Sequence, residues 1–209
     1  MCGIAGWLSY SLNMQTQQDT LQRMTDTMAL RGPDAEGVWI SGPIGLGHRR
    51  LSIIDLEGGK QPMLVRQDDG QQFAAITYSG EVYNFRELRA ELQVRGHRFE
   101  SRSDTEVVLR AYLEWGEGFV DHLNGMFAFA LWDMRNQQLL LIRDRMGVKP
   151  LYYYQTGDGV IFGSEPKALL ANPLVPRKVR ADGLREILEM VKTPGHAVFH
   201  GMREVLPGE

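Results

Sequence analysis

Short apolar stretches separated by turn-forming residues run through much of the chain. The turn residues between them are Ser41-Gly42-Pro43, Asp69-Gly70, Arg135-Asn136 and Thr156-Gly157-Asp158-Gly159. Connections this short join antiparallel strands, because parallel strands need long crossovers. Some stretches are apolar at both odd and even positions, which predicts strands that are buried on both faces. These stretches are MFAFALWD (126–133), LLLIRD (139–144) and LYYY (151–154).

Apolar residues at helical spacing predict amphipathic helices in other parts of the chain. Their apolar stripes are Leu21, Met24 and Met28; Leu88 and Leu92; Val108, Tyr112 and Trp115; and Leu184, Ile187, Leu188 and Val191. Ser103 and Glu106 have the spacing of a capping box, which predicts a helix start at this point. Together these elements predict an α+β fold in which helices cover the outer faces of two packed antiparallel sheets.

Composition and charge narrow the classes of protein that fit. The 209 residues are 43% hydrophobic and 23% charged, which is enough to bury a sizeable core. A formal net charge of -3 without basic blocks argues against nucleic-acid binding. No segment is long enough to span a membrane. The single cysteine excludes an internal disulfide, so we expect a cytoplasmic protein, although an extracellular protein without disulfides would also fit. The five histidines lack metal-ligand spacing, and we expect no metal site.

The one cysteine, Cys2, directly follows the initiator methionine. Methionine before a small residue is usually removed, which would leave a thiol and a free α-amine on the same residue. An α-amine with an ordinary pKa of about 7.7–8.0 accepts a thiol proton near neutral pH, so one residue would supply both nucleophile and base. Taken alone, however, Cys2 fits a small buried apolar residue better, because free cysteines are commonly buried.

Eight short motifs change that interpretation. They are MCGIAGW (1–7), RGPD (31–34), GHRRLSIID (47–55), YSGEVYN (78–84), SDTEVVL (103–109), LNGMFAFALWD (123–133), RDRMGVKPLYY (143–153) and GSEPKALL (163–170). In this order they resemble the N-terminal glutaminase domain of glutamine-dependent asparagine synthetases. That domain is a class II glutamine amidotransferase and belongs to the N-terminal-nucleophile hydrolases. The resemblance implies a four-layer αββα sandwich of two antiparallel sheets flanked by helices.

The resemblance also implies roles for individual residues. Cys2 would attack the side-chain amide of L-glutamine, release ammonia and form a glutamyl thioester that water then hydrolyses. Arg50 would bind the substrate α-carboxylate, for which a guanidinium group is well suited. Asp104 would hold the α-ammonium group, with Glu81 at the same end of the substrate. The walls of the glutamine pocket would be Leu51, Ile53 and Ile54.

Simpler explanations exist for these charged residues. Asp104 would stabilise the first turn of a helix through the helix dipole in any case. Glu81 would otherwise be a solvated carboxylate in a turn, and Arg50 one member of a surface pair with Arg49. We expect the motifs RGPD and RDRMGVKP to support the site structurally, and a direct role for Arg31 is the less favoured alternative.

Ser79 departs from the family pattern. The family more commonly has asparagine at this position, and its side-chain amide forms the oxyanion hole together with the N–H of the next glycine. Gly80 still supplies that N–H, but Ser79 offers only a shorter hydroxyl donor. Loss of one oxyanion donor typically costs about 2.7–4 kcal/mol of transition-state stabilisation. The hydroxyl could substitute for the amide, another donor or a water could replace it, or turnover could be slow.

The resemblance divides the chain into a glutaminase core, residues 1–170, and a connection toward an absent C-terminal synthetase domain, residues 171–209. The glutaminase would need no cofactor, whereas the synthetase domain would use ATP and Mg²⁺ to amidate aspartate. The chain lacks that domain's glycine-rich pyrophosphate loop and any Walker motif. The expected partners are L-glutamine and the synthetase domain, and a homodimer stays open.

Two alternatives and one condition accompany this hypothesis. The nitrogen acceptor could be a carboxylate other than aspartate. The chain could also be a non-catalytic module that binds glutamine or docks on the synthetase domain, and Ser79 is the argument for it. A molecule that retains Met1 is expected to be inactive, because the Cys2 nitrogen would then be an amide, which cannot act as a base.

Overall fold

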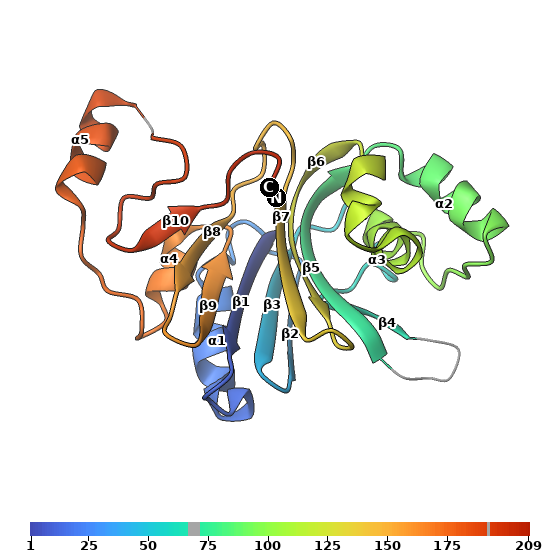
Figure 1. The fold of residues 1–209 in the computed structure, drawn as a ribbon, viewed down its shortest axis with the longest axis horizontal. Coiled ribbons are helices and arrows are strands. Elements are labelled where there is room, and N and C mark those ends of the chain that lie inside the picture. Colours follow the sequence, from blue (N-terminus) through green and yellow to red (C-terminus); the bar gives the residue numbers. More distant parts are fainter. Residues whose placement is uncertain (67–71, 192) are drawn as a thin grey trace.

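Two antiparallel sheets form the centre of the computed structural model, which describes residues 1–66, 72–191 and 193–209 (Figure 1). The six-stranded sheet has the order β10-β8-β9-β1-β3-β2, and the four-stranded sheet has the order β4-β5-β6-β7. The strands are β1 (Gly3–Ser9), β2 (Ala35–Ser41), β3 (Ile44–Arg50), β4 (Met63–Arg66), β5 (Gln72–Val82), β6 (Gly125–Asp133), β7 (Gln138–Arg143), β8 (Tyr152–Gln155), β9 (Gly159–Gly163) and β10 (Met202–Glu204). The α-helices are α1 (Gln18–Asp26), α2 (Phe85–Val94), α3 (Asp104–Trp115), α4 (Pro166–Leu170) and α5 (Ala181–Glu189), and the 3₁₀ helices are η1 (Met14–Gln17) and η2 (Gly116–His122).

The sheets face each other, and helices cover both outer faces (Figure 1). α1 and α4 pack on the six-stranded sheet, where Met24 and Leu169 contact the face that Trp7 lies on. α2 and α3 pack on the four-stranded sheet through residues such as Leu92 and Val108. A separate apolar cluster lies between the sheets. The chain is therefore the four-layer αββα sandwich that the resemblance implied.

β6 shows why a strand in this fold is apolar at every position. Phe127, Phe129 and Leu131 face the helices, whereas Ala128, Ala130 and Trp132 face the other sheet. Burial on both sides follows from the strand's place between two apolar layers, as its sequence predicted.

β7 and β8 also pack apolar side chains on both faces, but their residues are mostly half-buried, so the prediction of burial holds only in part. β7 is the edge strand of its sheet, and β8 is separated from the edge only by the short β10. Strands near an edge have fewer neighbours to cover them, whatever their composition.

The predicted hairpins that the structure describes are confirmed. β2 turns into β3 at Gly42, β6 into β7 after Asp133, and β8 into β9 after Gln155. Gly42 has φ +55°, a conformation that glycine adopts without strain. The hairpin predicted at Asp69-Gly70 lies outside the described residues.

α3 starts where the sequence predicted, but only half of the capping box forms. Ser103 is the N-cap, and its hydroxyl accepts a hydrogen bond from the Thr105 N–H. The Glu106 carboxylate does not return to Ser103. It accepts instead from the backbone N–H groups of Glu100 and Ser101, so it holds the loop before the helix.

α5 forms but ends at Glu189, so Val191 lies beyond the helix, and the predicted apolar stripe is not part of the core. The side chains of this stripe are 51–76% exposed and comprise Leu184, Ile187, Leu188 and Val191. In Figure 1, α5 projects from the edge of the molecule, beyond the six-stranded sheet.

Parts of residues 171–209 pack against the body of the domain. β10 adds a strand to the six-stranded sheet by pairing with β8. Val175, Ala197 and Met202 are buried in the cluster that α1 and α4 cover. The role of this segment as a connection toward another domain stays a prediction.

Candidate active site

Cys2 lies directly before β1, at the end of a strand that is paired on both sides, to β3 and β9. Its thiol donates a long hydrogen bond to the Leu51 carbonyl (Sγ to O 3.6 Å) and accepts one from the Leu51 N–H (3.4 Å). The Cys2 carbonyl accepts from Arg31 Nε and from the Ser79 hydroxyl, each at 3.0 Å. The central strand and these contacts hold the thiol at the junction of the two sheets.

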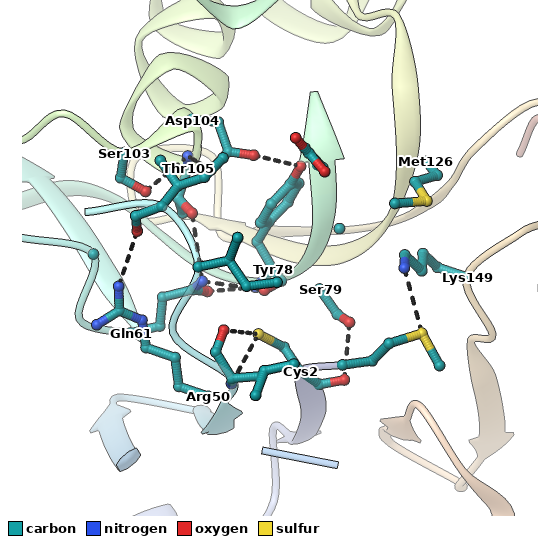
Figure 2. Close-up of a pocket in the computed structure, with 17 residues that line it drawn as sticks. Cys2, Arg50, Gln61, Tyr78, Ser79, Ser103, Asp104, Thr105, Met126 and Lys149 are labelled. Carbon is teal, nitrogen blue, oxygen red and sulfur yellow. Dashed lines mark hydrogen bonds between the residues drawn. The ribbon is translucent and has the colours of Figure 1, made fainter. Parts of the chain in front are cut away.

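The thiol borders a cavity of about 180 Å³ (Figure 2). Every site residue predicted from the sequence lines it: Cys2, Arg50, Leu51, Ile53, Ile54, Ser79, Gly80, Glu81 and Asp104. Met1 lines the cavity too. Further lining residues that no motif marked as part of the site are Gly59, Gln61, Tyr78, Ser103, Thr105, Met126 and Lys149. Residues from six separate parts of the chain thus meet around a single thiol.

Arg50 is the cation on one wall, and it is only 6% exposed. Its guanidinium donates to the carbonyls of Ile54 (3.1 Å), Asp55 (2.6 Å) and Leu56 (2.8 Å), so the segment after β3 wraps around it. An arginine has five N–H donors, and these contacts use three of them. The guanidinium group also lines the cavity. Arg50 is therefore not a member of a surface pair, although Arg49 does pair with exposed carboxylates.

Asp55 closes this segment by a second set of contacts. Its carboxylate accepts from the backbone N–H groups of Arg102 and Gly58, at 2.7 and 2.9 Å, and these bonds lower the pKa of Asp55. The bond to Arg102 ties the loop that carries Ile53 and Ile54 to the loop before α3. The two walls of the cavity are thus joined.

Asp104 is the buried carboxylate at the start of α3. Its Oδ2 accepts from the Tyr78 hydroxyl (3.0 Å) and the Val82 N–H (3.2 Å), and its Oδ1 accepts from the Thr105 N–H (3.0 Å). Burial raises the pKa of Asp104, although these hydrogen bonds act in the opposite direction. Burial, together with the Asp104 charge, also raises the pKa of Tyr78 well above its usual range. Asp104 is thus more than a surface residue that complements the helix dipole.

Gln61 holds the strand that carries Ser79 and Gly80. Its side-chain carbonyl accepts from the Tyr78 N–H (2.7 Å), and its amide nitrogen donates to the Tyr78 carbonyl (3.1 Å). A side-chain amide here replaces the missing neighbour strand beside β5. Its sequence position in an irregular loop gave no signal of this role.

Ser79 and Gly80 lie side by side on β5, opposite Ala128 and Phe127 of β6. The Ser79 hydroxyl donates to the Cys2 carbonyl, so its one hydrogen is directed at the backbone. A Cβ at Gly80 would lie 2.3 Å from the Met126 carbonyl oxygen, which leaves room only for glycine. The oxyanion role of both residues stays a prediction.

The motif RDRMGVKP forms a tight turn around two buried charges. The Asp144 carboxylate accepts from the N–H groups of Phe127, Val148 and Lys149. Arg143 donates to the carbonyls of Lys149 and Val205. These residues have the structural role predicted for the motif, but the side chain of Lys149 reaches into the cavity.

Arg31 of the RGPD motif acts on the backbone of Cys2. Besides its bond to the Cys2 carbonyl, its guanidinium forms an ion pair with Glu165 (3.0 Å). The amine of Met1 donates to the Arg31 carbonyl at 3.0 Å, and the Met1 sulfur lies 3.4 Å from Lys149 Nζ. Met1 therefore occupies the amino side of Cys2 and lines the cavity.

Within the described ranges, no three metal-ligating side chains come together. No helix in this part of the chain is long and apolar enough to cross a membrane. His48 is fully buried between the sheets, where its Nδ1 lies 3.1 Å from the Thr77 hydroxyl. It is a packing residue without neighbouring ligands.

Comparisons with known proteins agree with this geometry. The glutamine amidotransferase domain family matches residues 1–209. Asparagine synthetase (glutamine-hydrolyzing) 3 of Bacillus subtilis (strain 168) is 47% identical over 209 residues, which cover 99% of this chain and 34% of that protein. Amidase chry2 of Gibberella zeae is 37% identical over 221 residues, which cover 100% of this chain and 32% of that protein. The chain thus spans about a third of the length of these curated relatives.

Solved structures support the fold. Glutamine phosphoribosylpyrophosphate (PRPP) amidotransferase from B. subtilis, complexed with ADP and GMP, superposes with a TM-score of 0.65 at 21% identity, over 81% of this chain and 43% of that chain. At this identity the likeness concerns the fold alone. The family match over the full sequence and the identity to asparagine synthetases carry the assignment: this chain belongs to the glutamine amidotransferase domain family.

Proposed function

We propose that the chain, once Met1 is removed, hydrolyses the side-chain amide of L-glutamine with Cys2 as the nucleophile. The observation that carries this proposal is the position of the Cys2 thiol in a cavity that also contains a buried arginine and a buried aspartate. A free amino acid has a carboxylate and an ammonium group, and Arg50 and Asp104 offer the opposite charges.

The proposed chemistry uses the two functional groups of Cys2. The α-amine takes the thiol proton, and the sulfur attacks the amide carbon of glutamine. The C–N bond breaks, ammonia leaves with a proton from the amine, and a glutamyl thioester forms. Water then hydrolyses the thioester to glutamate and restores the thiol.

The cavity residues would divide the binding of glutamine among them. Arg50 would bind the α-carboxylate through its positive charge, and Asp104 with Glu81 would face the α-ammonium group. The apolar walls would be Leu51, Ile53 and Ile54. The Gly80 N–H would stabilise the oxyanion, with Ser79 beside it.

The fate of the ammonia is proposed from the relatives' names. Several are glutamine-hydrolysing asparagine synthetases, and this chain matches only part of their length. We propose that the ammonia passes to a synthetase domain that uses ATP and Mg²⁺ to amidate aspartate, in a cytoplasmic enzyme. No cofactor is proposed for the glutaminase itself, and a homodimer is compatible with this function.

The first test is the intact mass of the purified protein before and after incubation with a diazo-ketone analogue of glutamine. We expect the loss of one methionine and a single adduct that maps to Cys2. Cys2→Ala should form no adduct and release no ammonia from glutamine. A processed protein that forms neither adduct nor ammonia would overturn the proposal.

A second candidate is a module that binds glutamine without hydrolysing it. The observation in its favour is that the Ser79 hydroxyl donates to the Cys2 carbonyl, so that this hydrogen is not available to an oxyanion. Saturable binding of glutamine to a processed protein that releases no ammonia would support this candidate.

The nitrogen acceptor could also be a compound other than aspartate. Amidase chry2, at 37% identity, has a name that does not refer to asparagine, so a carboxylate other than aspartate is the alternative acceptor. Full-length protein supplied with glutamine, ATP and either aspartate or other carboxylates would distinguish them by the amide formed.

A further inference from the structure

Lys149 is a buried cation that the proposed mechanism does not use. It is 6% exposed, and its side chain borders the cavity. Its Nζ lies 3.4 Å from the Met1 sulfur, which is a weak acceptor. No ion pair among the described residues includes Lys149. A buried ammonium without an anionic partner loses hydration free energy, so its retention calls for a reason.

The backbone of Lys149 is held firmly. Its N–H donates to Asp144 Oδ2 at 3.0 Å, and its carbonyl accepts from Arg143 Nε at 2.7 Å. Pro150 follows and restricts the backbone of Lys149 further. The turn therefore fixes the backbone from which the Lys149 side chain reaches the cavity.

The ammonium group lies on the amino side of Cys2. The Met1 sulfur contacts Lys149 Nζ, whereas the Cys2 thiol is bonded to Leu51. In Figure 2 the Cys2 sulfur points away from Lys149. Removal of Met1 would take away this side chain and leave the new α-amine of Cys2 on the side that Lys149 faces.

We propose that the ammonium group of Lys149 keeps the α-amine of Cys2 in its neutral form, so that the amine serves as the base. This inference rests on the proposed glutaminase function. A nearby positive charge disfavours protonation of an amine, and a poorly solvated site strengthens the effect. Lys149 would be a positioning residue in the electrostatic sense, because it acts through Cys2 and does not contact the reacting atoms.

The same charge would assist the second proton transfer. When the thiol proton has moved to the amine, two cations face each other. Once the C–S bond has formed, the repulsion favours release of that proton to the departing nitrogen as the C–N bond breaks. Ammonia then leaves, and Lys149 takes no part in the proton transfer.

Other charges surround Cys2, but they are committed to partners or face the substrate end of the cavity. Arg31 binds the Cys2 carbonyl and forms an ion pair with Glu165. Arg50 binds three carbonyls. The remaining titratable groups around the cavity are Glu81, Asp104 and Tyr78. Lys149 is the cation whose ammonium group contacts Met1, the residue that is removed.

The test compares Lys149→Met with the wild type, both with Met1 removal verified by mass. The acid limb of the pH profile of kcat/KM for glutamine should move upward by about 0.5–2 pH units in Lys149→Met. Lys149→Arg keeps the charge and should restore the wild-type limb. Lys178→Met removes a charge from an exposed lysine and should leave the profile unchanged.

A second readout does not require turnover. The chain contains one cysteine, so labelling with [¹³C]cysteine gives a single Cα and a single Cβ signal. Followed together with pH, they separate the titrations of amine and thiol. The amine should titrate at higher pH in Lys149→Met than in wild type.

The outcomes separate this inference from the proposed function. An active wild type whose acid limb and Cα titration are the same in Lys149→Met would overturn the inference alone. A processed wild type without glutaminase activity would overturn the function, and the Cα titration would still decide whether Lys149 acts on the amine.

Discussion

Ser79 stands where the resemblance to the glutaminase domain leads us to expect asparagine. Its hydroxyl is bonded to the Cys2 carbonyl, so an asparagine here would exchange that bond for an amide that reaches into the cavity. Because one oxyanion donor contributes about 10²–10³-fold in kcat, we expect Ser79→Asn to raise kcat for glutamine by about 10-fold or more. Steady-state ammonia release measures it. Ser79→Ala is the control, since it removes the hydroxyl without adding a donor and should give no gain. A lower kcat in Ser79→Asn would contradict the prediction.

His48 is a residue whose burial affects stability rather than catalysis. Burial, with a smaller effect of Arg50, lowers the pKa of His48 from 6.5 to about 3. In the unfolded chain His48 is protonated below about pH 6.5, whereas in the folded chain it is protonated only below about pH 3. The free energy of unfolding therefore falls as the pH drops through this window.

The measurement is urea unfolding at pH 7 and pH 5. We expect His48 to account for about 2 kcal/mol of the loss between these two values. The free energy of unfolding of His48→Leu should fall between pH 7 and pH 5 by that much less than the wild type's. Equal losses in the two proteins would show that His48 does not make this contribution.

Individual site residues were predictable from the sequence only where a motif contained them. Cys2, Arg50 and Asp104 belong to motifs, and all border the cavity. Gln61 reaches across from an irregular loop to the backbone of Tyr78, and no spacing rule connects the two positions. The Lys149 side chain is in a motif, but its burial without a carboxylate depends on the folded turn.

At the scale of elements, the start of α3 can be tested directly. The Ser103 hydroxyl accepts the hydrogen bond from the Thr105 N–H that caps this helix. Loss of such a cap typically costs about 1 kcal/mol, so Ser103→Ala should lower the free energy of unfolding by that amount. Chemical denaturation measures it, and Ser41→Ala at the end of β2 is a control outside the helix. If Ser103→Ala is as stable as Ser41→Ala, the Ser103 cap does not stabilise the helix. The bonds from Glu106 to the loop before α3 would then be enough to fix the start of the helix.

Element types were more predictable than their surroundings. Hairpins depend on local residues, and the turn at Gly42 needs only a residue that tolerates positive φ. Burial of β7 and β8 depends on their order in the sheets, which is set by pairings distant in sequence. The apolar stripe of α5 has helical spacing like the others, but spacing does not say what covers it.

For the whole molecule, burial separates leucines that look alike in the sequence. Leu131 is fully buried in the cluster under α2 and α3, whereas Leu188 of α5 is 76% exposed. We expect Leu131→Ala to cost about 2–5 kcal/mol and Leu188→Ala less than about 0.5 kcal/mol. Denaturant unfolding of the two variants is the measurement. A large cost for Leu188→Ala would mean that α5 is covered in solution.

The architecture itself followed from the combination of hairpins and flanking helices, and the αββα order is confirmed. The choice of which helix covers which sheet required the three-dimensional structure, because each apolar face is compatible with either sheet.

The position of β1 between β3 and β9 has a consequence for hydrogen exchange. Amides in a strand with two partners exchange chiefly when the whole domain opens, whereas loop amides exchange through local fluctuations. Ile4 to Leu8 should therefore be among the slowest amides, and residues 51–59 should exchange much faster. The nucleophile would be attached to the most persistent part of the molecule, while the segment that surrounds Arg50 could open to admit glutamine without disturbing it.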